Sequence, residues 1–206
     1  RKNKDRYFFK NLKKGINEEF NLDFHSPYGC SKGSADQYIN DYSRIYNIDG
    51  YVLRQSCIYG TNQFGIEDQG WVSWFIIASI LKKKFKVYGD GKQVRDILYI
   101  DDLNKLYYKI ALNKKKLNTG RIFNVGGGYK FSLSLLELFK ILKKEYGLKL
   151  KYSFQDERKG DQKIFISDNS KVNKIFNWSP KIDPINGIKI LTNWVIKNKK
   201  KVSSIV

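Results

Sequence analysis

His25-Ser26-Pro27-Tyr28-Gly29-Cys30-Ser31-Lys32-Gly33 predicts the start of a helix, and the rest of the chain can be understood from this point outward. Ser26 is a good N-cap, since its hydroxyl can accept a hydrogen bond from a free backbone N–H of the first turn. Pro27 suits the first helical position, where its missing N–H costs nothing. We expect the helix to extend to about Tyr46. Apolar side chains recur along it at helical spacing and predict a buried stripe of Ala35, Tyr38, Ile39, Tyr42 and Ile45.

Tyr28 and Lys32 lie four residues apart and therefore share one face of this helix, with their Cβ atoms about 5–6 Å apart. A phenol normally loses its proton at about pH 10. The ammonium one turn away and the positive end of the helix dipole both favour the phenolate. Such a tyrosine can exchange a proton with an alcohol near neutral pH. The spacing thus predicts a pair of catalytic side chains.

A Tyr and a Lys at this spacing can also be a coincidence in a chain with 14 Tyr and 39 Lys and Arg. Tyr88 and Lys92 have the same spacing, yet they enclose Gly89-Asp90-Gly91, which predicts a turn and not a helix. The pair at Tyr28 and Lys32 therefore depends on the N-cap before it and on the motifs that follow it.

Further motifs follow along the chain: Asp68-Gln69-Gly70-Trp71-Val72, Gly89-Asp90-Gly91-Lys92-Gln93-Val94-Arg95-Asp96, Asn124-Val125-Gly126-Gly127 and Trp178-Ser179-Pro180. Together with residues 22–38, they resemble the extended short-chain dehydrogenase/reductase superfamily and, within it, the NAD-dependent nucleotide-sugar epimerases and dehydratases. Each motif is modest alone, but their order and spacing are specific. The resemblance covers nearly the whole chain from about Gly15 onward.

The resemblance implies a chemistry for the helix. Tyr28, as tyrosinate, takes the proton from a sugar hydroxyl, while Lys32 favours the tyrosinate and binds the nicotinamide ribose. NAD takes the hydride and returns it to the other face of the sugar, so the protein supplies position and proton transfer. The chain most closely resembles epimerases that act at C2 of a CDP-sugar. A UDP-sugar 4-epimerase or a related nucleotide-sugar dehydratase is the alternative.

Two arginines are candidates for binding the diphosphate of the substrate. Arg95 lies just before a predicted strand, and Arg158 lies in a polar loop. A guanidinium grips a diphosphate through paired N–H groups at a fixed geometry, which lysine cannot reproduce. Each arginine could equally form a surface ion pair, with Asp96 or Asp161 as the partner. The family resemblance favours the diphosphate role for both.

The end of the next strand is a second candidate site. The resemblance places Gln55 and Ser56 against the nicotinamide side of NAD, and Cys57 and Gln69 beside the sugar nucleotide. Cys57 has no basic neighbour in sequence that would favour a thiolate, so we expect no nucleophilic role. His25 is the only histidine, and a lone histidine is usually a hydrogen-bonded structural group.

The resembled family begins with a strand–GxxGxxG–helix segment that holds the NAD pyrophosphate, and it carries a Ser or Thr that bonds the reacting oxygen. Neither is found in this sequence. We therefore expect the chain to be the C-terminal part of such an enzyme, with the other half outside this sequence or on a separate chain. Two alternatives stay open: a catalytically silent remnant that binds a CDP- or UDP-sugar, and a basic nucleic-acid-binding domain.

A helix followed by the apolar strand Tyr51–Gly60 is typical of a parallel sheet in an α/β protein. We expect residues 1–60 to form the C-terminal portion of a Rossmann-like NAD-binding domain. Residues 61–206 should form mainly a smaller, mixed α/β domain that binds the nucleotide sugar. Later helices are predicted at Trp71–Lys84, Leu133–Tyr146, Ser170–Phe176 and Pro184–Lys197. Another helix is predicted to start with Asp101 or Asp102 as its cap and to end at about Leu112. Strands are predicted at Lys86–Tyr88, Val94–Ile100, Arg121–Val125 and Lys149–Phe154.

The formal charge of +19 invites a nucleic-acid or anionic-membrane interpretation. The lysines argue against it, because they are scattered, and their runs at 82–84, 114–116 and 199–201 each lie at the end of a predicted helix. Cys30 and Cys57 form no CxxC motif and predict a reducing compartment, with neither a disulfide framework nor a metal site. No apolar run is long enough to span a bilayer. We expect a soluble cytoplasmic protein without a nucleic-acid or membrane partner; a homo-oligomer is an open option.

Overall fold

The computed structural model describes residues 1–113 and 121–206, so the lysine run at 114–116 lies outside the described residues. Its helices are α1 (Pro27–Ile45), α2 (Trp71–Ile80), α3 (Ile100–Ala111), α4 (Leu135–Tyr146), α5 (Ser170–Phe176), α6 (Pro184–Lys197) and α7 (Lys199–Ile205), with the short 3-10 helix η1 (Tyr129–Phe131). Its strands are β1 (Val52–Gln55), β2 (Cys57–Tyr59), β3 (Lys84–Tyr88), β4 (Val94–Tyr99), β5 (Ile122–Val125), β6 (Ser132–Ser134), β7 (Lys151–Gln155) and β8 (Ile164–Phe165). The α/β class expected from the sequence is confirmed.

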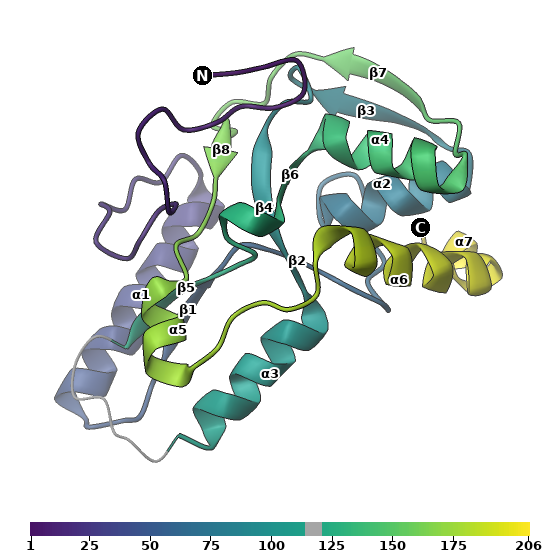
Figure 1. Ribbon diagram of the computed structural model, residues 1–206. Helices are drawn as coiled ribbons and strands as arrows, with labels where there is room; N and C mark the ends of the chain where they lie inside the picture. The colour runs from purple at the N-terminus through teal and green to yellow at the C-terminus, as the bar shows by residue number, and fades with distance from the viewer. Residues whose placement is uncertain (114–120) are drawn as a thin grey trace.

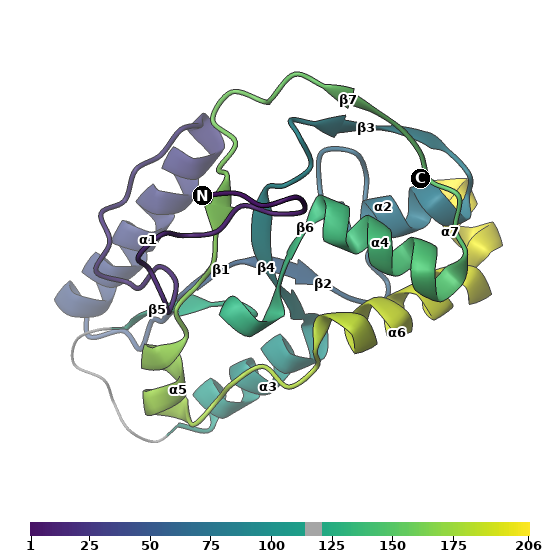
Figure 2. The ribbon, with the colours of Figure 1, turned by 45° about the horizontal axis from the view of Figure 1, so that its top comes forward.

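The strands pair mostly in parallel. β1 pairs with β5, β2 and β8 each pair with β4, and β3 pairs with β7, all in parallel, whereas β6 runs antiparallel to β4. Figure 1 shows α1 beside the β1–β5 pair on one side of the molecule and α2, α4, α6 and α7 on the other. Figure 2 shows β4 between these two parts. β4 therefore joins them.

The strand expected at Tyr51–Gly60 is divided into two at Ser56. Before this residue β1 pairs with β5, and after it β2 pairs with β4. The backbone N–H of Ser56 still donates to the carbonyl of Val125 at the end of β5, 2.8 Å away. Its hydroxyl donates to the backbone carbonyl of Asp96 in β4, also at 2.8 Å. Ser56 thus bonds to both neighbours at the point where the chain changes partner.

Buried apolar side chains form two clusters. The larger cluster joins α2, α4 and α6 to β3, and its innermost members include Ile76, Leu138 and Leu191. α2 is apolar on all sides and is buried from Val72 to Ile80, as expected for a core helix. The smaller cluster joins α3, α5 and β5 around Phe123. Burying one such side chain contributes about 1.5–3 kcal/mol, so these contacts hold the helices on the sheets.

Helix α1 begins as its sequence predicts. The Ser26 hydroxyl accepts a hydrogen bond from the backbone N–H of Gly29 at 3.0 Å, and Pro27 takes the first helical position. Asp36 is buried on the inner face and accepts a hydrogen bond from Arg54 Nε of β1 at 2.5 Å. This ion pair fixes α1 to the strand beside it and gives Arg54 a structural role.

The apolar stripe of α1 is exposed, which corrects the expectation that it is buried. Tyr38 is 67% exposed, and Ile39, Tyr42 and Ile45 are exposed as well, as is Ala35. The helix instead buries Gly33, Asp36 and Ser43 against the rest of the described chain. Gly33 lies against the Phe24 ring, Ser43 lies near Gly50, and Asp36 pairs with Arg54 of β1. The described residues contain no element that covers the stripe.

Element boundaries differ from the predictions where local hydrogen bonds decide them. Ser134 and Glu137 form a capping box, so α4 starts at Leu135 and Leu133 belongs to β6. Asp102 does not cap α3, because its carboxylate accepts the backbone N–H of Lys181 and of Ile182 instead. Helix α2 ends at Ile80, before the lysine run at 82–84, and α7 was not expected.

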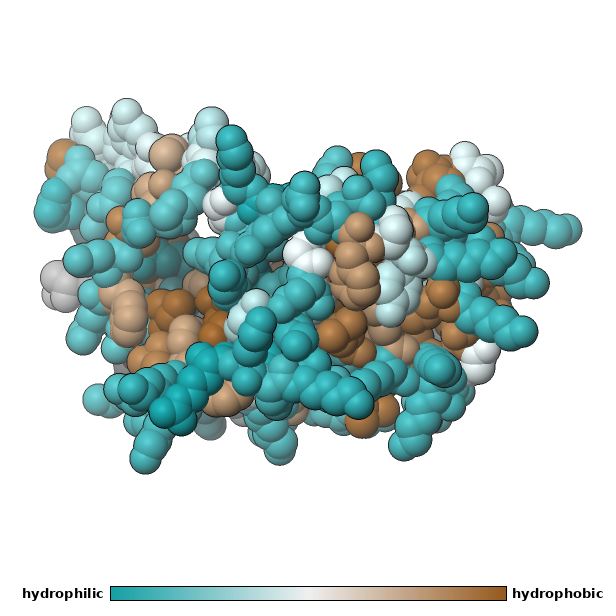
Figure 3. Space-filling view, turned by 90° about the horizontal axis from the view of Figure 1, so that it is seen from above, coloured by the Kyte–Doolittle hydropathy of each residue, from teal (hydrophilic) through white to brown (hydrophobic). Residues whose placement is uncertain are grey.

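The surface agrees with scattered lysines. Seen from above, hydrophilic side chains cover most of the molecule, with separate hydrophobic patches between them (Figure 3). Within the described residues, no helix has the length and apolar character that crossing a bilayer would require.

Candidate active site

Tyr28 and Lys32 line the same groove, as their spacing predicts. The groove has a volume of about 560 Å³ and runs along α1 and β1. Tyr28 is 73% exposed, so its phenol can be reached by a ligand. Lys32 Nζ lies 5.6 Å from the centroid of the Tyr28 ring. The structure thus brings the phenol and the ammonium together on an open surface, which proton exchange with a bound alcohol requires.

Gln55 lines the same groove at the carboxyl end of β1, and its side-chain amide donates to the Tyr107 hydroxyl at 2.6 Å. In parallel sheets, ligands bind at the carboxyl ends of strands. Ser56 follows directly, but its hydroxyl points to Asp96. Cys57 is half-buried, and burial raises the pKa of its thiol. The thiol is therefore neutral near physiological pH, in agreement with the absence of a nucleophilic role.

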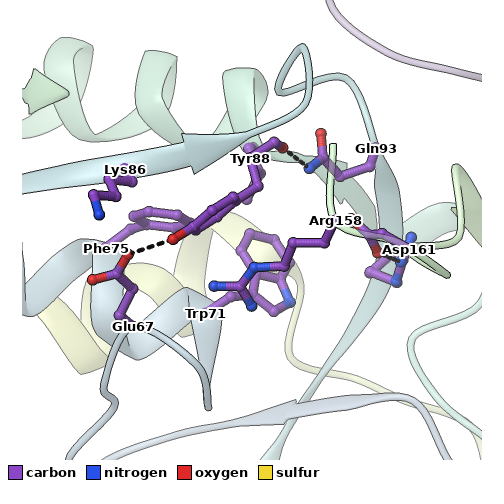
Figure 4. Close-up of a pocket in the computed structure, with 10 residues that line it drawn as sticks. Glu67, Trp71, Phe75, Lys86, Tyr88, Gln93, Arg158 and Asp161 are labelled. Carbon is purple, nitrogen blue, oxygen red and sulfur yellow. Dashed lines mark hydrogen bonds and ion pairs between the residues drawn. The ribbon is translucent and has the colours of Figure 1, made fainter. Parts of the chain in front are cut away.

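Arg95 and Arg158 both line a second pocket, although they lie 63 positions apart in the sequence. The pocket has a volume of about 150 Å³ and is lined by Glu67, Trp71, Phe75, Lys86, Tyr88, Gln93, Arg95, Leu135, Arg158 and Asp161. Figure 4 shows Arg158 reaching across it between the Tyr88 ring and Trp71. The two predicted diphosphate ligands thus lie in one pocket.

Both arginines also form ion pairs. Arg95 Nη2 lies 2.8 Å from Asp161 Oδ1, which is one of the partners considered from the sequence. Arg158 Nη2 lies 2.8 Å from Asp68 Oδ1, a partner that the sequence did not indicate. Each guanidinium has further N–H groups beyond those in these pairs. The ion-pair role and a diphosphate role are therefore compatible in the same side chain.

Tyr88 is a pocket residue that the sequence analysis did not identify as part of a site. Its ring lies under Arg158, with 4.0 Å from the guanidinium carbon to the ring centroid. Its hydroxyl donates to Glu67 Oε1 at 3.2 Å, and Gln93 Nε2 donates to its backbone carbonyl at 2.8 Å (Figure 4). An aromatic residue directly before the Gly89-Asp90-Gly91 turn was the signal that could have indicated it.

Asp96 was also missed as a structural centre. Its carboxylate is fully buried and accepts hydrogen bonds from the backbone N–H groups of Gly128 and Ser167, and from the hydroxyls of Ser56 and Ser167. Buried carboxylates persist when donors of this kind surround them. Asp96 thereby holds the loop after β5 and the segment after β8 against the strand that carries Arg95. Its position next to Arg95 in the motif was the available signal.

Ser56 and Cys57 line neither the groove nor the arginine pocket, and the same holds for Gln69 and His25. Gln69 is exposed and forms backbone hydrogen bonds with Ile66 in the loop before α2, but it does not line the arginine pocket. His25 is exposed and lies 3.3 Å from Asp23, which fits a hydrogen-bonded structural histidine.

The groove and the arginine pocket are neighbours. β8 connects them, because Phe165 lines the groove while its register partner in β4 is Arg95. The turn that carries Arg158 also reaches the start of α1: a Cβ on Gly160 would lie 3.1 Å from the His25 carbonyl oxygen. A ligand with an anionic end on the arginines and a hydroxyl-bearing end toward Tyr28 would fit this order.

The chain thus combines mostly parallel α/β pairing with a Tyr and a Lys on one helix and two arginines in a neighbouring pocket. The family model described as "NAD dependent epimerase/dehydratase family" matches residues 10–126, and the chain belongs to this family. The predicted family is thereby confirmed.

Among curated relatives, the chain is 42% identical over 185 residues to CDP-paratose 2-epimerase of Salmonella typhi, covering 87% of this chain and 54% of the relative. It is 34% identical to a putative UDP-glucose 4-epimerase of Methanocaldococcus jannaschii, covering 90% and 58%. The chain therefore spans little more than half the length of these relatives.

The solved structures agree on the fold. UDP-glucuronic acid 4-epimerase from Bacillus cereus, in complex with UDP-glucuronic acid and NAD, superimposes with a TM-score of 0.80 at 25% identity, covering 90% of this chain and 57% of that one. UDP-glucose 4-epimerase of Thermotoga maritima, with UDP-glucose, gives a TM-score of 0.75 at 30% identity, covering 84% and 54%.

Proposed function

We propose that this chain carries the catalytic helix and the nucleotide-sugar pocket of an NAD-dependent CDP-paratose 2-epimerase. The identity of 42% to the Salmonella typhi enzyme supports this substrate over a UDP-sugar, for which the relatives reach 34% and 33%. The observation that carries the proposal is the shared groove of Tyr28 and Lys32 next to the arginine pocket.

The residues of the groove fit a nicotinamide cofactor. Tyr28, Lys32 and Gln55 place a phenol, an ammonium and an amide along the groove. Lys32 can donate to ribose hydroxyls, and Gln55 lies at the strand end where a nicotinamide would bind. NAD, when bound, supplies hydride acceptance and return at the sugar carbon. We therefore propose these three residues as cofactor ligands. Ser56 would support the end of β1 through its hydrogen bonds to Asp96 and Val125.

Tyr28 is the proposed acid–base residue. As tyrosinate it would take the proton of the sugar C2 hydroxyl when the C2 hydride leaves, and it would return that proton when hydride is added back to the opposite face. Lys32, one turn away on the same helix face, would place its positive charge near the phenol oxygen during this step. Because the proton and the hydride both return, the sugar changes only its configuration.

The arginine pocket is the proposed site of the CDP moiety. Arg95 and Arg158 supply the N–H groups for the diphosphate. Tyr88 and Trp71 supply flat aromatic surface. Cys57, which has Trp71 and Arg95 as neighbours, and Gln69 do not line the pocket itself and are proposed contacts of the sugar end. A CDP-sugar or UDP-sugar is therefore the proposed ligand, and these side chains are its proposed contacts.

The test is turnover in the complete protein expressed from its gene. We expect epimerisation of CDP-paratose, and loss of at least about a thousandfold in kcat for Tyr28→Phe, because the acid–base group is removed. Binding of CDP, measured by titration calorimetry, should be unchanged in the variant. Wild-type turnover by Tyr28→Phe would remove this residue from the catalytic role.

A UDP-sugar 4-epimerase is the second candidate, supported by the Bacillus cereus and Thermotoga maritima structures. Turnover of UDP-glucose or UDP-glucuronic acid without turnover of CDP-paratose would establish it and reject the C2 assignment. Binding of CDP without binding of NAD would instead indicate a silent nucleotide-sugar-binding protein. Binding of neither, with salt-sensitive binding of DNA or RNA, would indicate a nucleic-acid partner.

A further inference from the structure

The turn Arg158–Asp161 lies across the arginine pocket and carries two side chains of opposite charge into it. The backbone N–H of Asp161 donates to the Arg158 carbonyl at 3.1 Å, which closes the turn. Gly160 has a φ of +79°, a conformation that favours glycine. Arg158 and Asp161 both line the pocket. We call this segment the 158–161 turn.

Two ion pairs hold the 158–161 turn. The turn supplies the arginine of one pair and the carboxylate of the other. Its arginine, Arg158, pairs with Asp68 of the loop before α2 at 2.8 Å. Its carboxylate, Asp161, pairs with Arg95 of β4 at 2.8 Å. Each of the two candidate diphosphate ligands thus already has one carboxylate as a partner.

The two ion pairs differ in their exposure to solvent. The side chains of Arg158 and Asp68 are 40% and 80% exposed, whereas those of Arg95 and Asp161 are 18% and 29% exposed. An exposed pair contributes little, because water and salt screen it. A shielded pair is screened less and holds its geometry more firmly.

The two arginines also differ in what else supports them. Arg158 lies 4.0 Å over the Tyr88 ring, so its plane stays oriented even without Asp68. Within residues 1–113 and 121–206, no aromatic ring supports the Arg95 guanidinium in this way. Its Nη1 donates to the neighbouring Val94 carbonyl at 2.9 Å. Its Nη2 donates to Asp161, which links the guanidinium to the 158–161 turn.

We infer that the two carboxylates have opposite effects on nucleotide binding: Asp161 is a positioning residue for Arg95, and Asp68 competes with the ligand's phosphates for Arg158. This inference rests on the proposed function, in which the pocket binds a nucleoside diphosphate. Asp161 keeps the Arg95 guanidinium in one orientation, with its remaining N–H groups available. Asp68 occupies the Arg158 edge that a phosphate would use, and it must yield that edge when the diphosphate binds.

The experiment measures the Kd of CDP and of cytidine by titration calorimetry for the wild-type protein and for Asp68→Asn, Asp161→Ala and Asp161→Asn. UDP and uridine are measured in parallel. Asp41→Asn is the matched control, because Asp41 pairs with Arg44 on the surface of α1, away from both cavities. Thermal unfolding of each variant accompanies the titrations.

We expect Asp68→Asn to bind the nucleoside diphosphate about two- to fivefold more tightly, the range of an exposed ion pair. Asp161→Ala should bind it about tenfold more weakly, because Arg95 loses its orientation. Asp161→Asn, which keeps an acceptor oxygen, should lose less. The Kd of the nucleoside without phosphates should stay unchanged in all of them, a pattern that general destabilisation of the pocket would not give.

Each other outcome overturns the inference. Weaker diphosphate binding by Asp68→Asn would show that Asp68 positions Arg158, and tighter binding by Asp161→Ala would show that Asp161 also competes. Equal losses for diphosphate and nucleoside would indicate damage to the pocket as a whole. If the wild-type protein binds neither CDP nor UDP, the proposed function fails together with the inference. Wild-type binding with the reversed order of variants rejects the inference alone.

Discussion

At the scale of single residues, the two cysteines should differ in reactivity. Burial raises the pKa of the Cys57 thiol, whereas Cys30 is exposed on α1. Only the thiolate reacts with iodoacetamide, so a raised pKa and restricted access both slow alkylation. We expect Cys30 to be labelled at about pH 8 at least about tenfold faster than Cys57, as measured by mass spectrometry of the peptides.

The control is the same labelling in concentrated urea, where both thiols should react at similar rates. Equal labelling of Cys30 and Cys57 in the folded protein would contradict the shielded environment of Cys57. It would also reopen a nucleophilic role for this residue, which neither its sequence neighbours nor its burial supports.

Local spacing made part of the site predictable at this scale. Tyr28 and Lys32 share a face because the helical repeat brings positions i and i+4 together. Arg158 pairs with Asp68, which lies 90 positions earlier in the sequence. It also stacks on Tyr88, which lies 70 positions earlier. No local rule relates such positions, so the sequence indicated the arginines but not what holds them.

At the scale of elements, the start of α6 provides a pH-dependent contribution to stability. The backbone N–H of Asn186 donates to the carboxylate of Asp183 at 3.1 Å, and this hydrogen bond holds the pKa of Asp183 below its ordinary value. In the unfolded chain the carboxyl titrates at about pH 3.9. The stabilisation is therefore complete above this pKa and is lost as the pH falls through the lower, folded-state pKa.

Asp183→Asn keeps an N-cap oxygen but removes the titration. We expect the wild-type protein to lose more free energy of unfolding than this variant between about pH 6 and about pH 2.5, by at most about 1 kcal/mol, since the carboxylate is partly exposed and screened. Urea unfolding followed by circular dichroism at both pH values measures this. A larger loss in the variant would contradict the direction of the pKa shift.

Two helices with a proline after a capping side chain were predictable at their starts: α1 begins at Pro27 after Ser26, and α6 begins at Pro184 after Asp183. α5 also has the bounds expected from its sequence, although no side chain caps it. The strand at Tyr51–Gly60 was less predictable, because it is divided at Ser56 by partners from β4 and β5. An apolar run predicts that a strand forms, but it does not show where that strand changes neighbours.

At the scale of the whole molecule, burial was the least predictable property. The stripe of Tyr38, Ile39 and Tyr42 has the helical spacing of a core face, yet it is exposed in the described chain. Burial depends on what else packs against a helix, and the chain spans little more than half of its curated relatives. The domain boundary near Thr61 stays a prediction. β5 lies well beyond that position in sequence and nevertheless pairs with β1.

Asp96 is the residue on which the connection between the two parts of the molecule most depends. Its buried carboxylate accepts hydrogen bonds from Ser56, Gly128 and Ser167, and a Cβ on Gly126 would lie 2.2 Å from Asp96 Oδ2. Removing the carboxylate leaves the backbone N–H groups of Gly128 and Ser167 and the Ser167 hydroxyl without this acceptor, while the Ser56 hydroxyl keeps the Asp96 backbone carbonyl. A buried group left unsatisfied costs about 1–3 kcal/mol.

We therefore expect Asp96→Ala to lower the free energy of unfolding by about 3–5 kcal/mol, a large fraction of the 5–15 kcal/mol typical of a folded domain. Urea unfolding measures this, with Asp41→Ala as an exposed-carboxylate control that should change it by less than about 1 kcal/mol. Asp96→Asn tests the role of the charge. The amide keeps one acceptor oxygen, but its NH2 group replaces the other oxygen and would face the surrounding N–H and O–H donors. A loss below about 1 kcal/mol for Asp96→Ala would show that these loops are held to β4 by their apolar contacts instead.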